Sequence, residues 1–399
     1  MERALADRTI ALAVTGSIAA YKAAIVARLL VTAGATVRPI MTTAAREFLG
    51  PATLSGITGQ AVPGSMWDPS FAGEMHVALA NEVDAILIVP ATADVLVRLV
   101  QGRANDLVCA LALVAKCPIL VAPAMHPRMW AHPVTQRNVA TLRADGRVTI
   151  LGPDTGLVAS GDAGEGRMVD PEVVFSATVA AVAPKDLAGK RLVISAGPTL
   201  EDLDPVRFLG NRSTGRMGFA LAVRAAARGA DTTLIAGPVT LPTPWGVRRV
   251  DVRSALEMQS ALGAVAGATD AIVMTAAVAD HRPAQKSAIK LKKQGDEESL
   301  LLAKNPDLIA DLGAKRRGRK PVLVAFALET GDHAHVVAEA KRKLAAKKVD
   351  FVVANEAGTA FGGDENEITF VSSEREERLP RGSKLDLADH ILDRIAALL

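Results

Sequence analysis

The feature that most constrains this chain is a series of short apolar runs, each followed by small or polar residues. A helical pattern over residues 19–33, closed by Gly34, separates the first two runs. Continuous Val, Ile and Leu runs that alternate with helices are typical of a parallel sheet covered on both faces. The first half is therefore predicted to be an α/β domain, with strands over residues 9–15, 36–41, 84–89 and 118–122.

A second series of such runs fills the other half of the chain. Residues 177–190 lie between the two series, and Pro184 and Gly189 make them a reasonable linker. We predict two Rossmann-like α/β domains with mainly parallel sheets, over residues 1–187 and 188–399. In open parallel sheets ligands bind beyond the carboxyl ends of the strands, so functional residues should follow the apolar runs. The strands expected in the second half cover residues 191–195, 231–236, 271–275, 322–326 and 350–354.

Composition excludes several classes of function. The formal net charge is only +3 in 399 residues and aromatic residues make up 3%, which argues against nucleic-acid binding. Cys109 and Cys117 have no metal-site spacing, which favours reduced thiols in the cytoplasm. No signal peptide is visible, and glycines and prolines interrupt the longest uncharged stretch, residues 48–67. We expect a cytoplasmic protein that binds neither nucleic acid nor membrane.

The loops after the first-half strands share a simple chemistry. A glycine permits a tight turn, a hydroxyl can bond a phosphate, and the following helix N-terminus favours an anion. Taken alone, the first loop is equally consistent with an anion site and with an ordinary turn in which Ser17 caps the following helix. Four consecutive strand ends carry special loops, which are harder to dismiss than one, and the first three of them contain Gly16, Ser17, Thr42, Ala91 and Thr92.

Two histidines and a serine complete the candidates in this half. His76 precedes the third strand, and histidine is a side chain suited to proton transfer near neutral pH, although a lone histidine is more often structural. His126 follows the fourth strand and Ser160 lies in a glycine-rich stretch. The ensemble resembles the flavin-dependent cysteine decarboxylases, through motifs in family order at residues 16–19, 74–80, 90–94, 102–107, 123–130 and 161–168.

That resemblance implies that residues 16, 17, 42, 91 and 92 hold FMN and that His76 is catalytic. In the implied reaction a cysteine thiol is oxidised toward a thioaldehyde, which accepts electrons as CO₂ leaves, and the product is then reduced. Two positions depart from the family pattern: His126 stands where many members have Asn, and Ser160 where many have a proton-donating Cys. His126 can still bond the substrate carboxylate, whereas Ser160, a much weaker acid, is a flap residue or relays a proton.

In the second half, an unusually long loop joins residue 195 to a helix near residue 217, and long loops tend to be functional. Asn211 lies in this loop. Arg216 stands where the family motif that this loop resembles usually has a lysine. Lys290 and Lys292 alternate, as on one face of a strand. In isolation such a charge run is usually a solvated surface. Asn355 follows the last predicted strand, and residues 361–368 match a late motif of a ligase family that this half resembles.

Over nearly its full length the chain resembles the bacterial bifunctional phosphopantothenoylcysteine decarboxylase/phosphopantothenate–cysteine ligases of coenzyme A synthesis. The resemblance implies that 4'-phosphopantothenate is activated by CTP as an acyl-cytidylate and then joined to L-cysteine. The product, 4'-phospho-N-pantothenoylcysteine, is the substrate of the decarboxylase half. Asn211 and Lys290 are expected to be catalytic, and CTP to bind Met274, Thr275, Ala276, Asp280, Lys290, Pro306, Asp307, Leu308, Ile309, Phe326, Lys343 and Lys347.

The resemblance also implies Mg²⁺ with the triphosphate, whose protein ligands the sequence leaves open. It further implies a homo-oligomer, a dodecamer in which flavin halves form trimers and ligase halves form dimers. Two alternatives stay open for the first half: a prenyltransferase-like domain that binds FMN without redox use, or a catalytically silent flavin-binding domain beside an active ligase.

Overall fold

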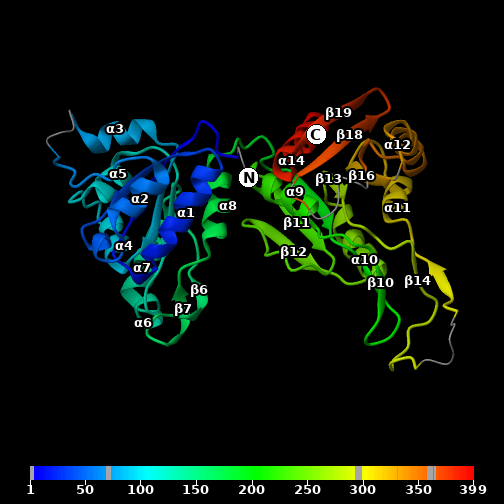
Figure 1. Cartoon of the computed structure of the whole chain (residues 1–399), viewed down its shortest axis with the longest axis horizontal. Coiled ribbons are helices and arrows are strands. Elements are labelled where there is room, and N and C mark those ends of the chain that lie inside the picture. The colour runs from blue at the N-terminus through cyan, green and yellow to red at the C-terminus, as the bar shows by residue number, and fades with distance from the viewer. Residues whose placement is uncertain (1–3, 69–72, 293–298, 330, 357–362, 364) are drawn as a thin grey trace. The chain divides into compact units, whose positions relative to one another are not determined.

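The computed structural model describes residues 4–68, 73–292, 299–329, 331–356, 363 and 365–399. The chain forms two compact units, Met1–Ala183 and Pro184–Leu399, each built around its own sheet (Figure 1). The linker expected over residues 177–190 is wrong in its first part. Residues up to Val182 belong to a helix, because Ala177, Thr178 and Val179 are buried against the core of the first unit.

The described part of the first unit contains a five-stranded parallel sheet in the order β2-β1-β3-β4-β5. Leu12, Leu87 and Leu120 lie side by side across three neighbouring strands and are fully or almost fully buried. Such continuous burial is what the apolar runs predicted. The strands are β1 (Thr9–Val14), β2 (Thr36–Met41), β3 (Ala85–Ala91), β4 (Ile119–Pro123) and β5 (Val148–Ile150).

Helices cover both faces of this sheet, since two separate hydrophobic clusters pack on it. A hairpin of β6 (Asp154–Leu157) and β7 (Ala163–Arg167) follows the sheet and was not predicted. Short 3₁₀ turns at Ile18–Ala20 and Ala44–Glu47 follow β1 and β2. The helices are α1 (Tyr21–Thr32), α2 (Pro51–Thr58), α3 (Met75–Glu82), α4 (Ala93–Val100), α5 (Leu107–Val114), α6 (Pro127–Trp130), α7 (Pro133–Ala144) and α8 (Pro171–Val182).

The second unit has an eight-stranded sheet in its described part, in the order β12-β11-β8-β13-β16-β17-β18-β19. The first six of these strands are parallel, and the last two add an antiparallel edge that was not predicted. The strands are β8 (Arg191–Ala196), β11 (Asp231–Ala236), β12 (Val247–Asp251), β13 (Ala271–Met274), β16 (Val322–Glu329), β17 (Phe351–Glu356), β18 (Glu365–Ser372) and β19 (Glu376–Ser383).

Helices flank this sheet as well: α9 (Arg216–Ala227), α10 (Ala255–Ala266), α11 (Leu308–Lys315), α12 (His333–Lys347) and α14 (Lys384–Leu398). The long loop after β8 contains its own hairpin of β9 (Leu200–Asp202) and β10 (Phe208–Gly210). A further small pair is formed by β14 (His281–Pro283) and β15 (Leu302–Lys304).

The predicted fold class, two α/β domains with mainly parallel sheets, is confirmed. In each sheet the strand order reverses at one point, between β1 and β3 in the first unit and between β8 and β13 in the second. Such switch points leave a crevice for ligands beyond the strand ends. Among the described residues, no helix has the length and apolar character needed to cross a bilayer.

Candidate functional sites

In the first unit, the carboxyl ends of β1 and β3 are tied together at the switch point. The Thr15 hydroxyl donates to the Pro90 carbonyl oxygen at 2.7 Å and accepts from the Thr92 backbone N–H at 3.2 Å. Ala124, after β4, donates its backbone N–H to the Ala91 carbonyl at 3.0 Å. The loops that carry the predicted anion-binding residues of β1 and β3 therefore meet at one edge of the sheet.

Three hydroxyls at these loops begin helical turns. The oxygens of Ser17, Thr42 and Thr92 accept backbone N–H groups at 3.3, 3.2 and 3.3 Å respectively. A hydroxyl that accepts one hydrogen bond still has its own proton to donate. At Gly16 a Cβ would lie 2.6 Å from the Ala44 Cβ, so glycine is needed where the β1 and β2 loops approach. This donor set fits the phosphate of a flavin nucleotide.

His126 and Ser160 are brought together by a residue that sequence reasoning did not single out. Asp162 Oδ2 lies 2.8 Å from His126 Nε2 and 2.8 Å from Ser160 Oγ. These two hydrogen bonds, the one from His126 first, hold the pKa of the Asp162 carboxyl below its ordinary value. Asp162 belongs to the glycine-rich motif at residues 161–168, and its position beside His126 was invisible because 36 residues separate them.

The hairpin that carries Ser160 and Asp162 is seated closely against the loop of His126. The Met125 backbone N–H donates to the Gly166 carbonyl at 3.0 Å. A Cβ at Gly166 would lie 2.4 Å from the Met125 carbonyl oxygen, so only glycine permits this approach. The hairpin therefore belongs to the same site as the β4 loop.

His76 lies half-buried in the first turn of α3. The neighbouring Met75 packs in the same hydrophobic cluster as Leu107 and Val108 of α5, which fixes the start of the helix. In the described part of the chain, no hydrogen bond is recorded between His76 and the other predicted residues of this half. Its catalytic role stays a prediction.

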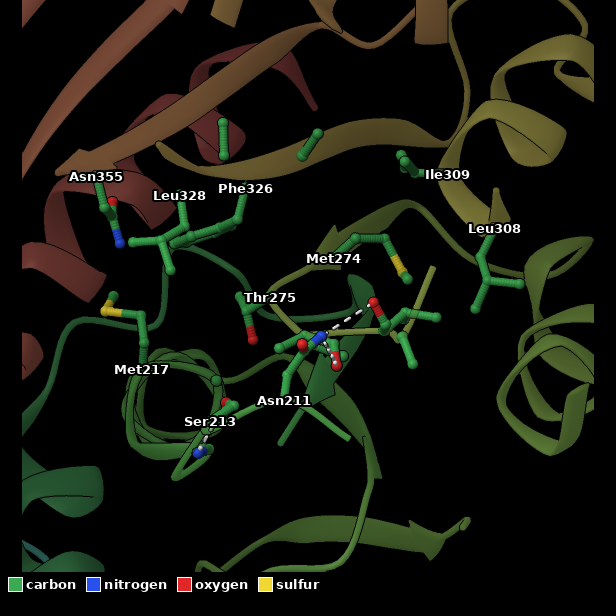
Figure 2. Close-up of a pocket in the computed structure, with 18 of the residues that line it drawn as sticks. Asn211, Ser213, Met217, Met274, Thr275, Leu308, Ile309, Phe326, Leu328 and Asn355 are labelled. Carbon is green, nitrogen blue, oxygen red and sulfur yellow. Dashed lines mark hydrogen bonds between the residues drawn. The ribbon is translucent and has the colours of Figure 1, made fainter. Parts of the chain in front are cut away.

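In the second unit a cavity of about 770 Å³ lies beyond the carboxyl ends of β8, β13, β16 and β17. Figure 2 shows an apolar wall on one side of it, including Met274, Leu308 and Phe326. The segments that line it are residues 210–218, 274–280, 304–309 and 325–328, with Lys343, Lys347, Asn355, Asn366 and Lys384. Every residue predicted to bind CTP is among them except Lys290.

Asn211 joins two of these segments. Its side-chain Nδ2 donates to the Ala277 and Val278 carbonyls at 3.1 and 3.2 Å (Figure 2). This holds the loop before α9 against the chain that leaves β13, across the switch point. The side chain thus lies where a substrate in the cavity would contact both segments.

Cations predominate in the cavity wall. Arg212, Arg216, Lys304, Lys343, Lys347 and Lys384 line it, against Asp280 and Asp307. Lys343 pairs with Glu329, and Lys347 Nζ lies 3.1 Å from Asp307 Oδ2. Lys343 and Lys347 both belong to α12, four residues apart, and both reach this cavity. The excess of positive charge suits a polyphosphate.

The strand expected around Lys290 and Lys292 is wrong. These residues are exposed and lie outside any strand, in an arm that follows β14. The arm forms hydrogen bonds to the turn between β9 and β10 and does not pair with a neighbouring strand. The Leu291 backbone N–H donates to Asp204 Oδ2 at 3.1 Å, and the Ser287 backbone N–H donates to the Leu203 carbonyl oxygen. Within the late motif at 361–368, residues 361, 362 and 364 lie outside the described residues.

Asn355, near the end of β17, is half-buried, and it is the one side chain of this cavity with a buried unsatisfied atom in the described part of the chain. Its Oδ1 has no hydrogen-bond partner there. Buried acceptors are usually satisfied, so this one points to a ligand that donates a hydrogen bond. The sequence placed Asn355 after the strand but offered no signal that its Oδ1 would be buried.

Comparisons with known proteins find similarity to both halves of the chain. Residues 1–183 match the family model described as Flavoprotein, and residues 187–399 the one described as DNA/pantothenate metabolism flavoprotein C-terminal domain. The chain is 43% identical to the coenzyme A biosynthesis bifunctional protein CoaBC of Vibrio cholerae, over 98% of this chain and 99% of that protein. The protein of the same name from Escherichia coli K12 is 41% identical, over 98% and 97% respectively.

Two solved structures are similar to one half each. The C-terminal domain of a CoaBC protein is 33% identical with a TM-score of 0.46, covering 54% of this chain and 97% of its own. A PPC decarboxylase mutant complexed with pantothenoylaminoethenethiol is 27% identical with a TM-score of 0.40, covering 43% and 96%.

Proposed function

The chain belongs to the CoaBC family of bifunctional coenzyme A biosynthesis proteins, and from that premise we propose the reaction and the residues of each half. Residues 188–399 join L-cysteine to 4'-phosphopantothenate with CTP. Residues 1–187 convert the resulting 4'-phospho-N-pantothenoylcysteine to 4'-phosphopantetheine and CO₂ with FMN. The observation that carries the proposal is the cavity at the switch point of the second sheet, whose lining combines several cations with apolar side chains such as Met274, Leu308 and Phe326.

In the ligase half, the substrate carboxylate attacks the α-phosphate of CTP and releases pyrophosphate. The amine of cysteine then attacks the acyl carbon, and CMP leaves. Lys343 and Lys347 neutralise the triphosphate from one helix face, while Phe326 and Met274 contact the base or ribose. Asn211 positions the acyl group for the second step, from its place across the switch point. Lys290 stabilises negative charge at the α-phosphate when its arm approaches the cavity.

Mg²⁺ enters this half with the triphosphate. The described residues contain no group of three or more His, Cys, Asp or Glu side chains suited to a metal ion. A triphosphate-bound Mg²⁺ needs only one or two protein carboxylates, because phosphate oxygens and water complete its coordination. The carboxylates present in the described cavity wall, Asp280 and Asp307, fit that requirement.

In the decarboxylase half, Gly16, Ser17, Thr42, Ala91 and Thr92 hold FMN at the switch point of the first sheet. When bound, FMN supplies the oxidation of the substrate thiol and the later reduction of the decarboxylated product. The protein orients the substrate and excludes water. His76 acts as acid or base at the substrate, and His126 donates Nε2–H to the carboxylate that will leave.

The family resemblance further supports a cytoplasmic homo-oligomer, a dodecamer of flavin-half trimers joined through ligase-half dimers. Sedimentation of the purified protein tests this assembly directly.

The deciding experiment is an assay of both half-reactions on one preparation. With CTP, Mg²⁺, cysteine and 4'-phosphopantothenate, the purified protein should release pyrophosphate and CMP and form the amide. The FMN-loaded protein should then release CO₂ from that amide. If the protein is yellow and forms the amide but never releases CO₂, the first half is a catalytically silent flavin-binding domain.

A further inference from the structure

A single carboxylate anchors the tip of the β6–β7 hairpin to the decarboxylase site. Asp162 Oδ2 accepts hydrogen bonds from His126 Nε2 and Ser160 Oγ, both at 2.8 Å. His126 lies three residues after β4, in the loop whose Ala124 is bonded to Ala91. The contact therefore lies at the strand-end edge where the substrate would bind.

The other ring nitrogen of His126 decides where its proton lies. Nδ1 accepts the Arg128 backbone N–H at 3.1 Å and caps α6, so the ring proton of neutral His126 is on Nε2. This side chain thus presents one N–H donor, and a carboxylate already occupies it. A donor arranged for the Asp162 carboxylate is equally suited to the carboxylate of a substrate.

Both carboxylates cannot accept this proton at once. One N–H group makes one good hydrogen bond, and two carboxylates placed at the same donor would repel each other. Asp162 is the partner able to move: its side chain is half-exposed, and it sits in a tight turn at the hairpin tip. The turn is closed on itself by Val158 N to Asp162 O and Gly161 N to Val158 O, both at 2.9 Å, so Ser160 moves with it.

We propose that Asp162 is an internal competitor for the substrate carboxylate, which replaces it on His126 Nε2 and thereby releases the hairpin tip. This inference rests on the decarboxylase function proposed above. In the covalent step the bond between the α-carbon and the carboxyl group breaks. Its electron pair passes into the adjacent thioaldehyde, and neutral CO₂ leaves while His126 keeps its proton.

Loss of CO₂ leaves the His126 N–H without its acceptor. Asp162 then returns to it, and the tip closes with Ser160 over the decarboxylated intermediate. Departure of the carboxylate is thus the event that closes the hairpin. Asp162 acts as a positioning residue, coupling the order of the chemical steps to the hairpin.

Equilibrium binding to the FMN-loaded full chain tests the exchange without turnover. One ligand is 4'-phospho-N-pantothenoylserine, which carries the carboxylate but lacks the thiol on which the proposed reaction starts. The other is 4'-phosphopantetheine, which lacks the carboxylate. Calorimetry compares the wild type with Asp162→Ala and with Asp154→Ala, which removes the same charge from the base of the same hairpin.

We expect Asp162→Ala to bind the carboxylate ligand about three- to tenfold more tightly, the range for an exposed charge-assisted hydrogen bond. Affinity for 4'-phosphopantetheine should stay the same or fall, and Asp154→Ala should match the wild type. An equal change for both ligands, or no gain for the carboxylate ligand, would overturn the exchange.

A second variant guards against indirect effects. In a His126→Ala background the substitution Asp162→Ala should no longer alter affinity for the carboxylate ligand, because the contested donor is gone. Persistence of the gain would refute competition at His126. A wild-type protein that binds neither ligand would remove the decarboxylase assignment itself, and the exchange with it.

Discussion

Thr92 donates its backbone N–H to the Thr15 hydroxyl, so the loops after β1 and β3 share a partly buried hydrogen bond at the switch point. The Thr15 hydroxyl in turn donates its own proton to the Pro90 carbonyl oxygen, at 2.7 Å. Its side chain is almost fully buried and is positioned by strands that are neighbours in space, although 77 residues separate Thr15 from Thr92.

Replacing Thr15 by Val should loosen this junction. The isosteric change leaves a buried carbonyl and an N–H without partners, which costs about 1–3 kcal/mol of unfolding free energy. Flavin affinity should fall with it, because Ala91 and Thr92 are no longer held. Urea unfolding and flavin titration measure the two effects. Thr36→Val, at the exposed start of β2, serves as control, and an unchanged flavin affinity would contradict the argument.

The two halves should be separable by single substitutions. His76→Asn should abolish CO₂ release and spare amide formation. Lys290→Gln should lower amide formation about tenfold or more and spare CO₂ release from the supplied amide. Lys292→Gln, on the same exposed arm, is the matched control for Lys290. Loss of both activities in either variant, with folding intact by circular dichroism, would argue against independent sites.

Asn355→Leu should separate stability from function. Removing a buried acceptor that has no partner within the described structure should raise the free energy of unfolding by about 1 kcal/mol. That corresponds to a melting temperature roughly 2–4 °C higher for a unit of this size. The KM of the ligase for one of its substrates should rise, since a ligand donor loses its acceptor. A destabilised variant with normal KM values would show that Asn355 is structural.

The environment of Asp202 indicates that part of the unfolding free energy of the second unit is lost in acid. Hydrogen bonds from Arg253 and then Lys286 lower the pKa of its carboxyl to about 2. As pH falls below about 4, the unfolded chain takes up this proton first, so stability is lost between roughly pH 4 and pH 2. Urea unfolding from pH 5 to pH 3 should be less pH-dependent in Asp202→Asn than in the wild type. Asp231→Asn, at the exposed start of β11, is the charge-matched control; an equal slope in all three proteins would refute the assignment.

Local sequence was a good guide where one strand and its own loop make the feature. The apolar runs located the central strands within three residues, and Gly16, Ser17, Thr42 and Thr92 lie in strand-end loops as expected. It was a poor guide for Lys290. Alternating lysines resemble a strand face, yet the backbone N–H of Leu291 is taken by the carboxylate of Asp204, which the alternation cannot reveal.

The sequence by itself determined the two α/β units and the edge of each sheet at which we propose that ligands bind, because apolar periodicity and loop chemistry are properties of neighbouring residues. Only the tertiary structure decided which side chains meet there. The pairing of Asp162 with His126 and the buried acceptor of Asn355 depend on hairpins and strands packed together from distant segments. Hydrogen-bond partners of that kind are set by the three-dimensional approach of the chain, which no local pattern encodes.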